Sequence, residues 1–320
     1  MLRGTTNMFP VIVVPSDASE SIETIGSKRK FWFQHPEFGR CLYKVARSDT
    51  GEDWSEKIAE QLCVLLSLPH ARYEMASWYD THTDENTRGV LSPTLVPNRE
   101  RLILGNELLV AHTKGYPAAD EAPSYGLKQH TLDAALALIG AIEAGLPPQW
   151  EALADIETPL DLFVGYLFLD ALIGNTDRHH ENWAFIEQGT SLADCASDRY
   201  LAPTFDHASC LGRNESDANR KKRLHSQDPR YSVTTYAAKA RSALYGTETD
   251  SRPLTVLEAF RRAAQVRPQA ADVWIGRLAG VADEDIQSLF ERVPIDRLSL
   301  PASEFAQALL KHNRHLLQSL

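Results

Sequence analysis

The stretch LIGNTDRHHENWAFI, residues 172–186, determines how the rest of this 320-residue chain is interpreted. It begins at the end of a run, residues 160–173, that is apolar nearly all round and therefore predicts a central buried helix. It ends in a second apolar segment, residues 183–186, which is typical of a short strand. The polar loop between them contains Asp177 and Asn182, which are five residues apart.

A second element, LAPTFDHAS at residues 201–209, places Asp206 where a strand would end. Phosphoryl transfer requires a carboxylate to take a hydroxyl proton, and an amide and a second carboxylate to hold Mg²⁺. The offset from Asp177 to Asn182 equals that of the protein-kinase catalytic loop. We therefore predict that Asp177 is the catalytic base, that Asn182 and Asp206 bind Mg²⁺, and that ATP is the phosphate donor.

A simpler interpretation makes Asn175, Thr176 and Asp177 turn and N-cap residues, and Asp206 a turn residue at the end of a strand. Either element alone is open to that interpretation. Because the two elements occur together, in this order and separated by a short insertion, phosphoryl transfer is the better explanation.

The N-terminal third of the chain is expected to bind the nucleotide. Lys44 lies between apolar neighbours in an expected strand, residues 40–46. Such a lysine either pairs with the nucleotide phosphates or protects the edge of a sheet. The amphipathic helix expected at residues 52–66 then supplies a glutamate to fix Lys44, with Glu56 as first choice and Glu60 as the alternative.

The segment around Gly26 and Ser27 is expected to cover the phosphates, although its single glycine completes neither a GxGxxG motif nor a Walker A motif. Further strands are expected at residues 70–79 and 88–96. A hinge is expected next, at residues 97–100, and backbone groups at about residues 95–98 would face an adenine ring. The remainder of the chain has the apolar spacing of helices.

The motifs at residues 175–182 and 201–206 resemble those of the HipA-like serine/threonine kinases, bacterial toxins of toxin–antitoxin pairs. The resemblance extends over nearly the whole chain. It implies an α+β, two-lobed protein-kinase-like fold, with a β-rich ATP-binding lobe at residues 1–98 and a helical catalytic lobe at residues 99–320. The sequence differs from the larger members in lacking their N-terminal subdomain and in its glycine-poor loop.

The resemblance also implies a biological role. Such kinases inhibit growth, act on a protein substrate such as an aminoacyl-tRNA synthetase, and are restrained by a helix-turn-helix antitoxin. Relatives are regulated by autophosphorylation in the loop over the phosphates, for which this sequence offers Ser27 and Thr24. Two other interpretations stay open: a catalytically silent ATP-binding module, and a kinase of small molecules or lipids on the same fold.

Composition and charge indicate which partners and which location to expect for the protein. The net charge of −10 argues against direct nucleic-acid binding, which depends on basic contacts to phosphate. The four cysteines show no CxxC spacing, which indicates reduced thiols and a cytoplasmic location. No apolar segment reaches transmembrane length, so no membrane is expected.

Residues 212–252 are polar and lack a periodic pattern, so we expect an irregular, mobile segment near the site. It contains the basic run RKKR at residues 220–223. We interpret this run as a solvated charged face, with docking of an acidic partner or a phosphorylated residue as the alternative.

Overall fold

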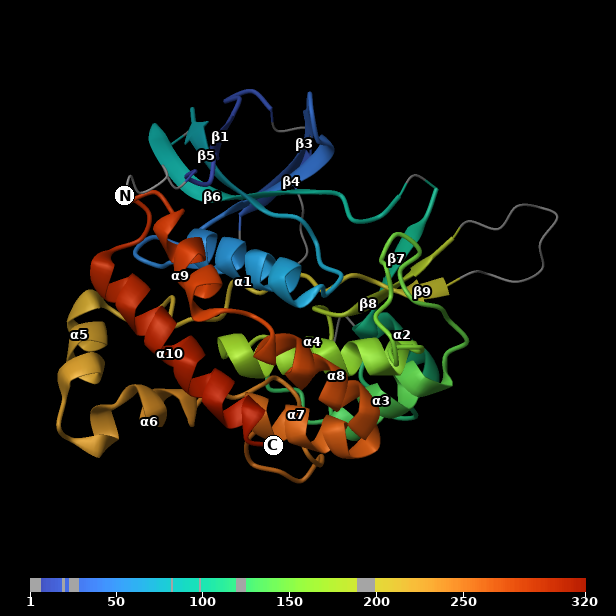
Figure 1. Ribbon diagram of the computed structural model, residues 1–320. Helices are drawn as coiled ribbons and strands as arrows, with labels where there is room; N and C mark the ends of the chain where they lie inside the picture. Colours follow the sequence, from blue (N-terminus) through green and yellow to red (C-terminus); the bar gives the residue numbers. More distant parts are fainter. Residues whose placement is uncertain are drawn as a thin grey trace.

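The computed structural model describes residues 7–18, 21–22, 29–81, 83–97, 99–118, 125–188 and 199–320. Within these ranges the chain forms a sheet-containing part, at the top of Figure 1, and a larger helical part below it. Helix α1 (Glu52–Leu66) lies between the two parts. The α+β architecture expected from the sequence is therefore confirmed.

The upper part is built on one sheet with the strand order β1-β5-β6-β4-β3-β2. Strands β1 and β5 run parallel, and the other neighbouring pairs are antiparallel. The strands are β1 (Val11–Val14), β2 (Ser21–Ile22), β3 (Lys30–His35), β4 (Gly39–Val45), β5 (Glu74–Asp80) and β6 (Glu85–Pro93).

Strand β4 carries Lys44 in the interior of this sheet. It lies between β3 and β6, so that Lys44 is in register with Lys30 on one side and Val90 on the other. Its neighbour Tyr43 belongs to a buried aromatic cluster, and the alternation of a strand therefore directs Lys44 to the opposite face. The edge-strand interpretation of Lys44 is wrong, because β4 has a partner strand on each side.

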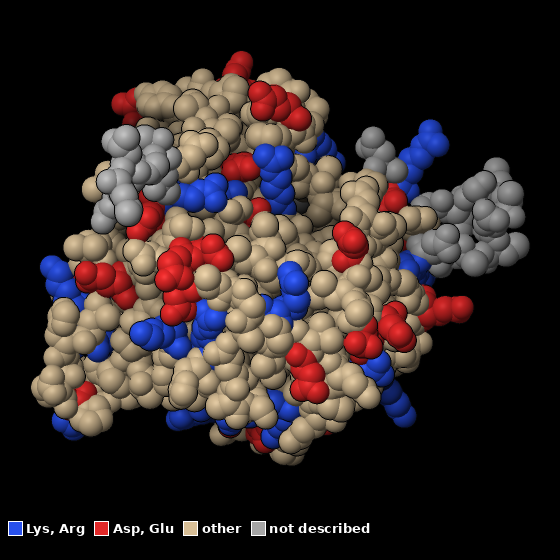
Figure 2. Space-filling view, viewed as in Figure 1, with Lys and Arg blue, Asp and Glu red and all other residues tan. Residues whose placement is uncertain are grey.

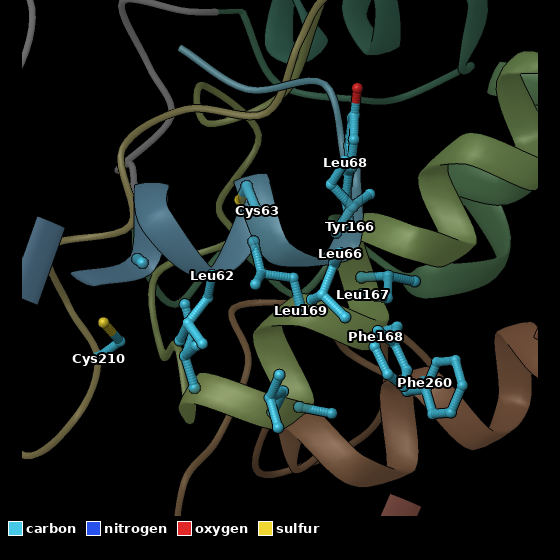
Figure 3. Close-up of a cluster of buried hydrophobic side chains, with 14 of the residues drawn as sticks. Leu62, Cys63, Leu66, Leu68, Tyr166, Leu167, Phe168, Leu169, Cys210 and Phe260 are labelled. Carbon is cyan, nitrogen blue, oxygen red and sulfur yellow. The ribbon is translucent and has the colours of Figure 1, made fainter. Parts of the chain in front are cut away.

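Helix α1 has the bounds that its amphipathic pattern predicts. Figure 3 shows Leu62 and Leu66 of α1 in one buried cluster with Leu167 and Phe168 of helix α4 (Pro159–Ile173). Full burial of one such side chain contributes about 2 kcal/mol relative to exposure. The hydrophobic core is therefore continuous from the underside of the sheet into the helical part.

Helix α4 is the centre of the lower part. Its first turn is fixed by a capping box between Thr158 and Asp161. All of its residues except Leu160 are buried, which confirms the prediction of a central buried helix. Gly165 permits close packing of another helix, because a Cβ at this position would lie 2.5 Å from the ring of Trp274.

Helix α4 packs against α3 (Leu132–Ala141), α7 (Val256–Val266), α8 (Pro268–Ala279) and α10 (Leu300–Gln318). Helix α2 (Gly105–His112) packs against α3, and α9 (Asp283–Glu291) packs against α1 and α10. The loop after α4 leads into a small sheet of β7 (Arg101–Leu104), β8 (Ala184–Glu187) and β9 (Arg199–Leu201). Strand β8 confirms the strand predicted after the polar loop. No helix in the described ranges is long and apolar enough to cross a membrane.

Residues 212–252 differ from the irregular segment expected. They contain α5 (Asp217–His225), a 3-10 turn (Pro229–Tyr231) and α6 (Val233–Ala237). Ser216 and Ser232 cap the two helices, and the few apolar side chains of α5 and α6 pack against α10. Two short helices with so few apolar residues leave little periodic pattern in the sequence. The RKKR run is not a uniform solvated face either, because Arg220 is buried and pairs with Asp217 at 2.8 Å.

Candidate active site

Two buried charged side chains fix the loop that follows α4. Gly174 ends the helix with a φ of 66°, a left-handed conformation that glycine adopts without strain. The Arg178 guanidinium then donates two hydrogen bonds back to Asp170 in the last turn of α4, at 2.7 and 2.8 Å. Asn175 Nδ2 donates a further bond to Asp170 at 2.8 Å. The loop therefore leaves the helix along one defined path.

Asn182 is held against Asp177 within this loop. Its Nδ2 donates to the carbonyl oxygen of Asp177 at 2.6 Å, and its own carbonyl accepts from Arg178 Nη1 at 2.7 Å. These bonds orient the side-chain amide and leave its Oδ1 as an acceptor. The five-residue spacing seen in the sequence thus becomes a closed turn in which Asp177 and Asn182 are adjacent.

The carboxylate of Asp177 accepts hydrogen bonds from two hydroxyls. Ser209 Oγ donates to Oδ2 at 3.0 Å, and the Tyr125 hydroxyl donates to Oδ1. His179 Nε2 lies 3.5 Å from the same Oδ1. Burial raises the pKa of Asp177 above its ordinary value, an effect that His179 and Tyr125 oppose and Asp206 reinforces. A raised pKa suits a group that must accept a proton.

Asp206 and Lys44 meet where the sheet adjoins the helical part, with Lys44 Nζ 3.3 Å from Asp206 Oδ1. The Asp206 backbone has a φ of 59°, a left-handed conformation that costs a non-glycine residue roughly 1 kcal/mol or more. Its N–H donates to the Tyr73 hydroxyl at 3.0 Å. Burial alone would lower the pKa of Lys44, but the negative charges of Asp206 and Glu56 raise it above its ordinary value. Lys44 is therefore charged.

Glu56 supports the segment that follows Asp206. Its Oε1 accepts from the His207 N–H at 2.7 Å, and its Oε2 accepts from the Ala208 N–H at 3.0 Å. Both carboxylate oxygens of this completely buried side chain thus hold the backbone next to Asp206. The predicted ion pair between Glu56 and Lys44 stays a prediction, since the ion pair that Lys44 forms here is with Asp206.

The alternative glutamate, Glu60, belongs to a different cluster on α1. Its carboxylate lies 3.0 Å from Lys57 Nζ and 3.6 Å from His70 Nε2. Of the two glutamates, Glu56 is the one whose negative charge raises the pKa of Lys44. The geometry therefore favours Glu56 as the glutamate that belongs to the site.

Three residues named from the sequence, Thr24, Gly26 and Ser27, lie outside the described residues, as does Asn98 of the expected hinge. Their assignments stay predictions. Strand β3 follows Thr24, Gly26 and Ser27 in the chain and pairs with β4. The chain therefore runs from the expected phosphate-covering segment into the strand beside Lys44.

Three contributors to the site are not evident from the sequence pattern. A carboxylate near the end of an apolar helix needs a buried partner, so Asp170 could have been found in this way. Ser209 lies in the quoted second motif, but its spacing does not show that its hydroxyl faces Asp177. Tyr125 comes from a stretch without periodicity, and its contact with Asp177 exists only in the folded chain.

The described residues bring two carboxylates, an amide and a charged lysine to one place. Figure 2 shows basic and acidic side chains close together on one face of the molecule, at the level where the two parts meet. The lysine can bind an anion, the amide and Asp206 can bind a cation, and Asp177 can take up a proton. These are the functions that phosphoryl transfer requires.

Comparison with known proteins defines the class of fold. No protein-family model matches the sequence, and no curated protein matches it. Among solved structures, the proinflammatory kinase CtkA of Helicobacter pylori matches with a TM-score of 0.67 and 17% identity, over 97% of this chain and 98% of that chain. HipA of Shewanella oneidensis MR-1, from a complex with HipB and operator DNA, matches with a TM-score of 0.51 and 11% identity.

The HipA match covers 98% of this chain and 66% of the HipA chain. At these identities the likeness establishes the fold alone. The chain has a protein-kinase-like α+β fold similar to that of two bacterial proteins, as its sequence predicts. The expected division between residues 98 and 99 stays a prediction.

Proposed function

We propose that this chain is an ATP- and Mg²⁺-dependent serine/threonine protein kinase. The observation that carries the proposal is the contact of Lys44 with Asp206 at 3.3 Å, beside the loop of Asp177 and Asn182, in a fold shared with CtkA. The hydrogen bond from Ser209 to Asp177 joins that loop to the Asp206 segment. These contacts support the assignment of residues predicted from separate parts of the sequence to one site.

The donor atoms of the site fit Mg²⁺. Asn182 Oδ1 remains an acceptor after its Nδ2 is used, and Asp206 supplies a carboxylate. Within the described ranges, no group of three or more His, Cys, Asp or Glu side chains is placed to hold a metal ion. Two protein ligands completed by water and phosphate oxygens are the arrangement typical of Mg²⁺ in phosphoryl-transfer enzymes. When bound there, the ion would neutralise charge on the phosphates.

In the proposed reaction, the substrate hydroxyl oxygen forms a bond to the γ-phosphorus of ATP. The bond between that phosphorus and the bridging oxygen of ADP breaks, and the hydroxyl proton passes to Asp177. Ser209 and His179 hold the Asp177 carboxylate in position. Lys44, which stays charged beside Asp206, would bind the α- and β-phosphates.

Transfer of labelled phosphate from ATP to a cell lysate tests this proposal. The wild-type protein with Mg²⁺ is expected to label proteins on serine or threonine. Asp177→Asn and Asp206→Asn are each expected to abolish labelling, and the double variant to lose little more, because the residues act as a unit. Near wild-type turnover in either folded variant would refute the assignment.

The same experiment distinguishes the two other interpretations. Label in the small-molecule or lipid fraction would indicate a kinase with a different substrate class. ATP binding without transfer would indicate a catalytically silent module.

We further propose that the kinase is a growth-inhibiting toxin that acts in the cytoplasm on a translation protein, such as an aminoacyl-tRNA synthetase, and is restrained by a helix-turn-helix antitoxin. The resemblance of the motifs at residues 175–182 and 201–206, and the likeness of the fold to HipA, support this role. Induced expression of the wild type is expected to arrest bacterial growth, whereas Asp177→Asn is not. Normal growth with an active kinase would contradict the toxin role alone.

Autophosphorylation of Ser27 or Thr24 belongs to the same proposal. A phosphate there adds nearly two negative charges and would repel the nucleotide phosphates. Intact-mass and peptide mass spectrometry after incubation with Mg-ATP are expected to find a phosphate between residues 21 and 30. Its absence from an active kinase would exclude this regulation.

A further inference from the structure

A pocket of about 260 Å³ opens next to the proposed catalytic base. One wall includes Thr176, which precedes Asp177, and Ser209, whose hydroxyl donates to Asp177. The segment that carries α5 and α6, at the left of Figure 1, supplies Arg223 and Tyr236 to the other wall. The pocket therefore lies between the catalytic loops and a segment to which the proposed function assigns no role.

The lining of this pocket is cationic. Arg213, Arg223 and Lys239 line it, and none of the described lining residues is acidic. This gathering of positive groups contrasts with the net charge of −10 for the whole chain. An anion is therefore the ligand that the lining favours.

Two of these cations have donors to spare for a ligand. Arg223 uses Nε and Nη2 for Glu215, at 3.2 and 3.3 Å, which leaves its Nη1. Lys239 is exposed, and its side chain forms no ion pair with any residue in the described ranges. Arg213, by contrast, is already bound to a carboxylate of α1 and donates to Ser209 Oγ at 3.0 Å.

The pocket is connected directly to the catalytic carboxylate. Arg213 Nη2 donates to Ser209 Oγ, and Ser209 Oγ donates to Asp177 Oδ2, each at 3.0 Å. An extended peptide advances about 3.3 Å per residue. A peptide whose hydroxyl lies at Asp177 would therefore place a side chain from a nearby position in the pocket.

We propose that this pocket is a specificity site, which binds an anionic side chain of the protein substrate within about three residues of the acceptor hydroxyl. The inference rests on the proposed kinase function. Lys239 and Arg223 would pair with the anion. The ring of Tyr236, whose centroid lies 4.9 Å from the Arg223 guanidinium carbon, holds that arginine at the pocket. Carboxylates and phosphorylated side chains share the required chemistry.

A peptide library tests the proposal. Each peptide has a central serine and carries glutamate, phosphoserine or lysine at one position on either side. An anionic residue at one of these positions is expected to give a kcat/KM about tenfold above that of the matched lysine peptide. Preference for glutamate or for phosphoserine supports the site and identifies the anion. Equal rates, or a preference for lysine, would overturn the proposal.

Charge reversal provides the matched variant. Lys239→Glu is expected to lower the ratio of kcat/KM between anionic and lysine peptides about tenfold or more, because attraction becomes repulsion. Lys221→Glu makes the same charge change on an exposed lysine of α5 that does not line the pocket, and is expected to leave the ratio unchanged. An unchanged ratio in Lys239→Glu would overturn the proposal even if the wild type is an active kinase.

Failure of the proposed function can be recognised separately. If the wild type labels no protein in a lysate, the kinase assignment fails, and binding then tests the pocket directly. Fluorescence anisotropy with labelled peptides is expected to show tighter binding of the glutamate peptide than of the lysine peptide, and a loss of this difference in Lys239→Glu. Equal affinities would overturn the anion site itself.

Discussion

The hydroxyl of Tyr125 donates to Oδ1 of Asp177, while Ser209 donates to Oδ2. In the proposed mechanism a substrate hydroxyl approaches one of these oxygens to give up its proton, so Tyr125 would occupy a position that the substrate needs. The Tyr125 side chain is 58% exposed, so it can move aside with little loss of packing. At the scale of the residue, the proposed mechanism therefore implies that Tyr125 competes with the substrate for Asp177.

Tyr125→Phe is expected to change the pH dependence of the reaction. The Tyr125 hydrogen bond stabilises the ionised carboxylate and lowers the pKa of Asp177, so its loss raises that pKa. Because the base must be ionised, the acid limb of kcat/KM is expected to move to higher pH. Above that limb, kcat/KM for a protein substrate is expected to rise about threefold, since one competing hydrogen bond is gone.

Tyr79→Phe is the matched control for this variant. It removes a tyrosine–aspartate hydrogen bond of the same kind, to Asp84 in the upper part of the molecule. Neither the acid limb nor the rate above it is expected to change. A Tyr125→Phe profile that coincides with the wild type, or moves to lower pH, would contradict the role of Tyr125.

At the scale of elements, helix α1 supports the segment that carries Asp206. Ser55 Oγ donates to the Ala208 carbonyl at 2.9 Å, and Glu56 accepts from the backbone of the same segment. The Gly51 N–H donates to the Arg213 carbonyl at 3.1 Å. The first turns of α1 therefore fix the chain after Asp206, while Lys44 pairs with Asp206 from the sheet.

Glu56→Ala is expected to reduce phosphotransfer more than a variant elsewhere on the same helix. It leaves the buried N–H groups of His207 and Ala208 without acceptors, at a cost of about 1–3 kcal/mol in stability. The Asp206 carboxylate is then less well positioned, so kcat is expected to fall at least tenfold. Single-turnover transfer and chemical denaturation measure the two effects.

Glu60→Ala is the control that distinguishes the role of Glu56 from that of the other glutamate of α1. It removes one partner of Lys57, which keeps Glu74 at 3.0 Å, and one partner of His70. The variant is expected to be less stable, but it leaves the Asp206 segment supported. Its turnover is therefore expected to stay close to that of the wild type. If both variants lose turnover equally, the effect belongs to the helix as a whole and not to Glu56.

The sequence predicts the bounds of α1 and α4 within one residue, because α1 has an amphipathic stripe and α4 is a continuous apolar run. It does not predict α5 and α6, because these short helices have few apolar residues and are fixed by caps and by packing against α10. In the same way, the spacing of Asp177 and Asn182 and the place of Lys44 in an alternating strand indicate these three as candidate site residues. The partners of Glu56 lie 151 and 152 residues later in the chain and depend on how α1 packs.

At the scale of the whole molecule, the segment between α9 and α10 joins the helical part to the sheet. Figure 1 shows this segment passing close to the start of the described chain, where the Phe9 N–H donates to the Arg292 carbonyl at 2.7 Å. Arg297 Nη1 donates to Asp53 Oδ2 at 2.9 Å and to the Ala76 carbonyl at 3.0 Å. This arginine thus connects the C-terminal segment to both α1 and β5.

Arg297→Met is expected to lower the free energy of unfolding by about 3 kcal/mol, because it leaves Asp53 buried without its counter-charge. Chemical denaturation at neutral pH measures the loss. Arg88→Met is the matched control, since Arg88 and Asp296 join the same parts at 3.6 Å but are both more than half exposed. Its loss is expected to be below about 1 kcal/mol. Equal small losses would show that the buried pair contributes little.

The loss of unfolding free energy in Arg297→Met is also expected to depend on pH. The surroundings of Asp53 determine whether the loss grows or shrinks on acidification. Burial raises the pKa of Asp53 and Arg297 opposes this, so the pKa rises further in the variant. The folded state then binds a proton that the unfolded state has released, and the free energy of unfolding falls as pH rises between the two pKa values. The difference in the free energy of unfolding between the wild type and Arg297→Met is therefore expected to shrink at mildly acidic pH. Adding Asp53→Asn to the Arg297→Met variant is expected to remove this pH dependence. A difference that grows on acidification would show that Asp53 stays ionised without Arg297, and that another cation is its counter-charge.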